Sequence, residues 1–82
     1  MHQIYILRSL KDDKTYVGYT VKGEKNRLKE HNAGLSKYTK PFVPWKLTYF
    51  EDFTCKNCAE KRERFLKSGF GFRLRKLIAE NF

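Results

Sequence analysis

The sequence predicts a mixed α/β (α+β) fold, a three-stranded antiparallel sheet flanked by helices in the chain order β-β-α-β-α-α. Segments rich in β-branched and aromatic residues occur at the start and in the middle of the chain, and charged segments with helical spacing follow them. Hydrophobic residues make up 40% and charged residues 33% of the 82 residues, which is typical of a globular protein. A chain of this length forms one domain, residues 1–82, with one modest core.

Three segments have the composition of strands. His2–Ser9 is rich in Ile, Tyr and Leu, and Thr15–Thr20 is rich in β-branched and aromatic residues. The aspartates of Lys11–Lys14 suit a turn, so we expect the first two strands to form a hairpin. Residues 35–44 contain both prolines and predict a loop, after which the alternating segment Trp45–Phe50 predicts the third strand.

Three helices are expected. The first covers Gly23–Asn32 and ends at the Asn-Ala-Gly sequence that closes this charged segment. The second covers Cys55–Lys67, with Thr54 as its N-cap residue and a Ser-Gly pair after its last turn. A short final helix is expected around Arg73–Glu80.

The two cysteines form a single Cys-x-x-Cys motif at Cys55 and Cys58. A structural zinc site requires four ligands, and neither histidine stands at zinc-finger spacing from this pair. The flanking residues also differ from those of a thioredoxin-like motif, which follows a strand in a βαβ unit. We therefore expect both cysteines to be small, buried residues of the second helix.

The net charge of +9, with a pI of about 9.8, favours a polyanionic partner, in particular nucleic acid, over a surface that is merely solvated. An anionic membrane is less favoured, because the basic residues do not line one amphipathic helix and no apolar run approaches the roughly 18 residues that span a bilayer. We expect an intracellular, cytoplasmic protein that contacts the phosphate backbone with little sequence preference. The candidate backbone contacts are Lys25, Lys29, Lys61, Arg64 and Lys67.

Two tyrosines and a glycine form the first part of a candidate site. If the two aspartates of the hairpin make a two-residue turn, Tyr5 lies on the same face as Tyr16 and Gly18. Gly18 would leave an opening on this face, where the backbone of a nucleic-acid ligand could approach. The alternative is that both tyrosines are ordinary core residues.

The two longer helices supply the remaining candidates. Arg27 and His31 are four residues apart and share one helix face, which is either part of a site or simply solvated. Glu63 follows the spacing of the apolar residues Ala59 and Leu66. A carboxylate beside an apolar stripe is partly desolvated unless a cation pairs with it, and that cation could be a neighbouring Lys or Arg or a divalent metal ion.

One ordered set of residues runs from Ile4 to about Lys67, nearly the whole chain. It consists of Gln3-Ile4-Tyr5, Tyr16-Val17-Gly18, Arg27, His31, and Glu63 within the segment Arg62–Lys67. This set resembles the GIY-YIG nuclease superfamily, in particular small stand-alone bacterial members similar to the nuclease domain of an excision-repair endonuclease. Glutamine replaces the first glycine of the name motif and valine replaces its isoleucine. His31 stands where many relatives have tyrosine.

The resemblance implies a divalent-metal-dependent endonuclease that hydrolyses phosphodiester bonds of DNA, with a role in repair or recombination. Glu63 would hold one Mg²⁺ or Mn²⁺ ion, and Arg27 would bind the phosphate. Tyr5, Tyr16 or His31 would orient the attacking water and take its proton. A protein partner would supply specificity, or a second copy of the chain would cut the other strand. The main alternative is a non-catalytic nucleic-acid-binding module with the same fold, but the presence of all five polar site residues favours the enzyme.

Overall fold

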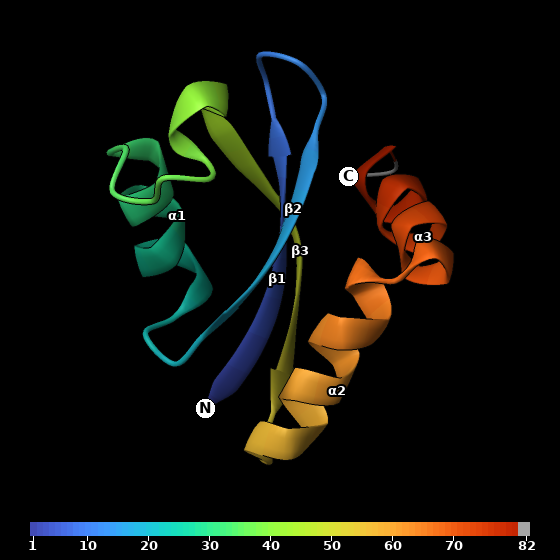
Figure 1. Cartoon of the computed structure of the whole chain (residues 1–82). Helices are drawn as coiled ribbons and strands as arrows, with labels where there is room; N and C mark the ends of the chain where they lie inside the picture. The colour runs from blue at the N-terminus through green and yellow to red at the C-terminus, as the bar shows by residue number, and fades with distance from the viewer. Residues whose placement is uncertain (81–82) are drawn as a thin grey trace.

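The computed structural model describes residues 1–80 and contains a three-stranded antiparallel sheet with helices on both faces (Figure 1). Its elements are β1 (His2–Ser9), β2 (Thr15–Thr20), α1 (Glu24–Asn32), a short 3-10 helix (Lys40–Phe42), β3 (Trp45–Phe53), α2 (Lys56–Lys67) and α3 (Gly69–Glu80). The strand order is β2-β1-β3, so the N-terminal strand lies in the centre. α1 covers one face of the sheet, and α2 and α3 cover the other (Figure 1). This arrangement confirms the predicted fold class and the predicted order of strands and longer helices.

The hairpin between β1 and β2 has a longer loop than the expected two-residue turn. Tyr5 pairs with Gly18, whereas the expected turn would pair it with Thr20. The backbone N–H of Ser9 donates to the carbonyl oxygen of Lys14 (N···O 2.8 Å), which leaves four residues in the loop. Because the register differs by two residues, an even number, the predicted set of side chains still lies on each face of the hairpin.

The central strand β1 is buried on both faces and takes part in two cores. Ile4 and Ile6 pack with Leu66 under α2 and α3, while Tyr5 packs with Trp45 on the α1 face. All five side chains are at most 4% exposed. Since complete burial of one large apolar side chain stabilises a fold by about 1.5–3 kcal/mol, both cores fix the position of β1 firmly.

β3 ends at Phe53 rather than at the predicted Phe50, because its pairing with β1 continues to that residue. Near this end, Gln3 of β1 donates hydrogen bonds through Nε2 to Oδ1 of Asp52 (2.7 Å) and to Oε2 of Glu24 (2.8 Å). Gln3, which stands where the motif has its first glycine, therefore links β1 to both α1 and β3.

α2 begins one residue later than predicted, and Cys55 rather than Thr54 is its N-cap residue. Cys55 and Cys58 are both exposed and free, so the expectation that they are buried is wrong. The buried face of α2 is formed by Ala59 and Leu66, and Cys58 lies about 100° around the helix from Ala59. Cys55 precedes the first turn of the helix and lies beyond this buried face.

α3 begins at Gly69, four residues before the predicted start at Arg73, because Ser68 caps two helices at once. Its hydroxyl donates to the carbonyl oxygen of Phe65 at the end of α2 (2.6 Å) and accepts from the backbone N–H of Gly71 in the first turn of α3 (3.2 Å). A Cβ atom at Gly71 would collide with the backbone of α2. Glycine therefore permits the close contact between the two helices.

Candidate active site

Tyr5, Tyr16 and His31 meet on the α1 face of the sheet. The ring centroids of Tyr16 and His31 lie 5.1 Å apart, those of Tyr5 and His31 5.8 Å, and those of the two tyrosines 6.4 Å. The predicted common face of the tyrosines is thus confirmed by their contact. His31 is fully buried, which excludes the solvated-face alternative for this residue.

A buried chain of hydrogen bonds passes through His31. The hydroxyl of Tyr5 lies 2.9 Å from Nε2, and Nδ1 lies 2.7 Å from Oγ1 of Thr39. The Thr39 hydroxyl also lies 3.5 Å from the carbonyl oxygen of Ser36, to which it can only donate. Thr39 therefore accepts the Nδ1–H of His31, which leaves Nε2 free to accept the hydroxyl proton of Tyr5.

Thr39 is a site residue that the sequence does not indicate. It stands in the expected loop, where no periodic pattern marks a buried position, and yet it is fully buried. The indole N–H of Trp45 donates to its carbonyl oxygen (2.9 Å), which fixes Thr39 beside His31. Only the path of the loop back across α1 brings this hydroxyl to the imidazole.

Burial keeps both members of the Tyr5–His31 pair uncharged at neutral pH. Burial, and after it the positive charge of Arg27, lower the pKa of His31 from 6.5 to about 4, while Glu30 acts in the opposite direction. Burial, and after it Tyr16, raise the pKa of Tyr5 to about 12, while Arg27 acts in the opposite direction. The pair is therefore a neutral phenol that donates to a neutral imidazole.

The depressed pKa of His31 predicts how folding stability depends on pH. Between about pH 6.5 and about pH 4 the unfolded chain binds a proton on this residue and the folded chain does not. The free energy of unfolding should therefore fall as the pH is lowered through this range. Urea denaturation at several pH values measures the effect, and His31→Gln, which cannot titrate, should flatten this part of the profile. An unchanged slope in His31→Gln would show that other groups cause it.

Arg27 lies beside this pair and beside a second cation. Its Nη1 donates to Oε1 of Glu30 (2.6 Å), and Nζ of Lys22 donates to Oε2 of the same carboxylate (3.2 Å). Arg27 is also close enough to Tyr5 to lower the pKa of its hydroxyl. A hollow of about 340 Å³ opens at this point, and two of its walls are cationic side chains. It is lined by Tyr19, Thr20, Val21, Lys22 and Arg27.

Gly18 lies directly opposite Tyr5 in the sheet. A Cβ atom at Gly18 would collide with the hydroxyl end of the Tyr5 ring. The space predicted to admit a ligand backbone is therefore occupied by Tyr5 itself. Glycine is needed at this position so that the Tyr5 hydroxyl can reach His31.

Glu63 lies on α2, which covers the other face of the sheet from α1 (Figure 1). Its carboxylate raises the pKa of Tyr5, in the opposite sense to Arg27. Its Oε2 accepts from Nζ of Lys67 (3.1 Å), so a neighbouring lysine offsets part of its charge. Among the side chains that the structure describes, no three of His, Cys, Asp or Glu form a group that could hold a metal ion. A single carboxylate still suits Mg²⁺, which keeps most of its water ligands and is commonly bound by one or two carboxylates together with substrate phosphates.

The predicted phosphate contacts lie on two different helices. Lys25 and Lys29 are exposed on α1, and Lys61, Arg64 and Lys67 are on α2, across the sheet (Figure 1). The fold therefore distributes these cations over two layers rather than one patch. In the described part of the chain, none of the helices has the length and apolar character that crossing a membrane requires.

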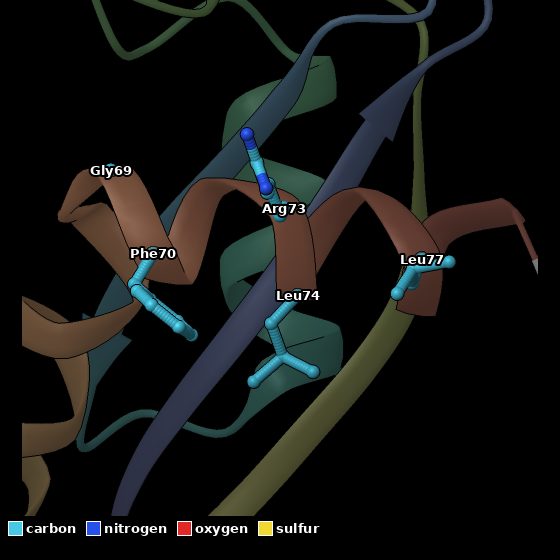
Figure 2. Close-up of a pocket in the computed structure, with 5 residues that line it drawn as sticks. All are labelled: Gly69, Phe70, Arg73, Leu74 and Leu77. Carbon is cyan, nitrogen blue, oxygen red and sulfur yellow. The ribbon is translucent and has the colours of Figure 1, made fainter.

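Another hollow, of about 500 Å³, lies on α3 and contains none of the predicted site residues. Its lining residues are Gly69, Phe70, Arg73, Leu74 and Leu77. Figure 2 shows Phe70 and Leu74 projecting from one side of α3 and Arg73 from the other. Because this hollow is largely apolar and does not reach the Tyr5–His31 pair, we assign the polar chemistry to the α1 face.

Comparison with known proteins places these residues in a family. The model of the GIY-YIG catalytic domain matches residues 1–76, a range that contains the whole cluster. A UPF0213 protein of Clostridium perfringens is 46% identical over 68 residues, which cover 82% of this chain and 71% of the relative. A UPF0213 protein of Natronomonas pharaonis is 38% identical over 80 residues, which cover 96% of this chain and 92% of the relative. A UPF0213 protein of Staphylococcus saprophyticus is 40% identical over 79 residues, which cover 96% of this chain and 95% of the relative. No solved structure matches the chain. The chain belongs to the GIY-YIG family.

Proposed function

We propose that this protein is a divalent-metal-dependent endonuclease that hydrolyses phosphodiester bonds of DNA, with branched or damaged DNA of repair or recombination as its substrate. The observation that carries the proposal is the buried hydrogen bond between Tyr5 and His31 (2.9 Å), with Arg27 beside it, in a chain that matches a catalytic domain.

Arg27 would bind the scissile phosphate. Its guanidinium can present two parallel N–H donors to phosphate oxygens and offset the charge that develops in the transition state. In the free protein Glu30 occupies part of this guanidinium, so a phosphate would compete with a carboxylate that is already shared with Lys22. The hollow beside Arg27 offers a place where the phosphate can lie between the two cations.

The Tyr5–His31 pair would manage the proton of the attacking water. With a pKa of about 12, Tyr5 is protonated at neutral pH and cannot be a base alone. Its oxygen could take the proton of the water as its own proton passes to Nε2 of His31. Tyr5 is only 1% exposed, so we expect Arg27 to turn towards the phosphate and uncover it. Tyr16, half-buried and packed edge-on against His31, would form the wall of the site.

Glu63 would hold one Mg²⁺ or Mn²⁺ ion, because its carboxylate is partly exposed and acts on Tyr5 electrostatically. When bound, such an ion polarises the phosphate and stabilises the leaving oxygen. Lys67 would have to release the carboxylate, and it could then contact the DNA backbone with Lys61 and Arg64.

A cleavage assay tests the proposal. Labelled linear, nicked and branched DNA is incubated with the protein and Mg²⁺, Mn²⁺ or a chelator. Cutting that requires the metal supports the endonuclease. Salt-sensitive binding of all substrates without cutting would favour the second candidate, a nucleic-acid-binding module, and the low exposure of Tyr5 is the observation that favours it.

The exposed cations predict a steep dependence of DNA affinity on salt. Each phosphate that a lysine or arginine neutralises should contribute a slope of about −0.9 to a plot of log K against log salt concentration. Fluorescence anisotropy between low and physiological salt measures this slope, and Lys29→Ala should make it shallower by about one phosphate. A flat salt profile would show that the basic residues are not the binding surface.

A further inference from the structure

We infer that Cys55 and Cys58 form a redox-active dithiol at the start of α2, which exchanges electrons with small disulfides of the glutathione class. This inference goes beyond the proposed nuclease function and does not depend on it. The sequence predicts inert core residues at both positions, and the exposure of the two cysteines changes that interpretation.

The geometry places the two thiols together. Cys55 is the N-cap residue of α2, with extended backbone angles (φ −113°, ψ 126°), and Cys58 is the third residue of the first turn. Residues three positions apart on a helix are neighbours, so the two cysteines lie next to each other, and both side chains are open to solvent.

The surroundings give the two sulfurs different reactivities. The backbone N–H and the thiol of Cys58 lower the pKa of the Cys55 thiol, and the N–H of Asn57 and the charge of Lys61 act in the same sense. The neighbouring sulfur of Cys55 raises the pKa of Cys58. Cys55 is thus the attacking thiolate, and Cys58 is the resolving thiol.

The exchange proceeds in two balanced steps. The Cys55 thiolate attacks one sulfur of glutathione disulfide, forms a mixed disulfide and releases one glutathione thiolate. Cys58 then loses its proton and attacks the Cys55 sulfur, which forms the Cys55–Cys58 disulfide and expels the second glutathione thiolate. The protein loses two electrons and two protons, and the glutathione disulfide is reduced to two thiols.

A structural metal site does not explain the pair. Zinc in a structural site takes four Cys or His ligands. In the range 1–80, however, no third Cys, His, Asp or Glu side chain joins these two cysteines in a group that could hold a metal ion. Neither cysteine contributes to the core. The two exposed thiols, one at the N-cap of α2 and one in its first turn, are therefore available for reaction with solutes.

Single serine variants test the assignment. The whole chain, and its Cys55→Ser and Cys58→Ser variants, are incubated with glutathione disulfide and analysed by intact mass. The wild type should lose two hydrogen atoms, and Cys58→Ser should retain one glutathionyl group. Cys55→Ser should react on the order of tenfold more slowly than Cys58→Ser, because the backbone N–H groups of Cys58 and Asn57, which lower the pKa of Cys55, remain in Cys58→Ser. Serine is a good N-cap residue, so this variant should remain folded, as circular dichroism can verify.

Three results would overturn the inference. One is equal reaction rates of the two single variants, which would make the cysteines ordinary exposed thiols. Another is a wild type that carries two glutathionyl groups and never loses them to form an internal disulfide. The third is oxidation only through disulfides between chains, which non-reducing electrophoresis would reveal.

Discussion

Arg27→Ala is expected to lower the rate of DNA cleavage by about two to three orders of magnitude, as removal of one transition-state charge partner commonly does. The positive charge of the guanidinium lowers the pKa values of both Tyr5 and His31. Single-turnover rates at saturating DNA separate this loss from weaker binding. Arg27→Lys keeps the charge but not the two parallel donors, so we expect it to recover only part of the rate.

Arg8→Ala is the matched control for this experiment. Arg8 is also a partly exposed arginine, but it pairs with Asp13 across the hairpin loop (2.7 Å) and takes no part in the cluster. Its removal should leave the rate unchanged. If Arg27→Ala cut as fast as Arg8→Ala, Arg27 would be a solvated helix residue and the phosphate site would have to be sought elsewhere.

Tyr5→Phe is expected to lower the single-turnover rate by about two orders of magnitude or more, because general acid–base groups typically contribute about 10²–10⁴-fold. The substitution removes the hydroxyl that joins the water to Nε2 of His31 and leaves this nitrogen without its partner. The unpaired buried nitrogen should also destabilise the fold by about 1–3 kcal/mol. Rates are therefore measured well below the melting temperature of the variant.

Tyr49→Phe serves as the control for Tyr5→Phe. Tyr49 lies on β3 and packs against the core on the opposite face of the sheet. It should retain the wild-type rate. If Tyr5→Phe is destabilised as expected but cuts DNA at the normal rate, the hydrogen bond between Tyr5 and His31 has only a structural role. Tyr16 would then be the next tyrosine to test.

Much of the fold follows from local signals in the sequence. The strands alternate or are rich in β-branched and aromatic residues, and these signals predict the face shared by Tyr5 and Tyr16 although they do not predict the turn. That prediction holds because an error of two residues in register preserves the face, whereas an error of one residue would have reversed it. The start of α3 escapes prediction because glycines at its first and third positions are typical of a loop, and the capping role of Ser68 depends on a contact with α2.

The site residues differ in how far the sequence reveals them. Motif and helical spacing predict that Arg27 and His31 belong to the candidate site, since both signals are local. Thr39 has no such signal, because its role arises from a loop that folds back over α1. At Gly18 the sequence predicts too much. The missing side chain indicates an opening for a ligand, but the ring of Tyr5 fills that space. Burial of the cysteines is also wrongly predicted, because Cys55 precedes the first turn of α2 and Cys58 lies about 100° around the helix from the buried Ala59.

If the cluster of Tyr5, Arg27 and His31 cuts DNA with a metal ion held by Glu63, removal of the Glu63 carboxylate should abolish cleavage. Wild type, Glu63→Ala and Glu60→Ala are purified identically and incubated with labelled branched and linear DNA in Mg²⁺ or Mn²⁺. Glu60 is the matched control, because it lies on the same helix and pairs with Lys56 rather than acting on the site. We expect wild type and Glu60→Ala to cut, and Glu63→Ala to bind DNA without cutting. Full cleavage by Glu63→Ala would contradict the account.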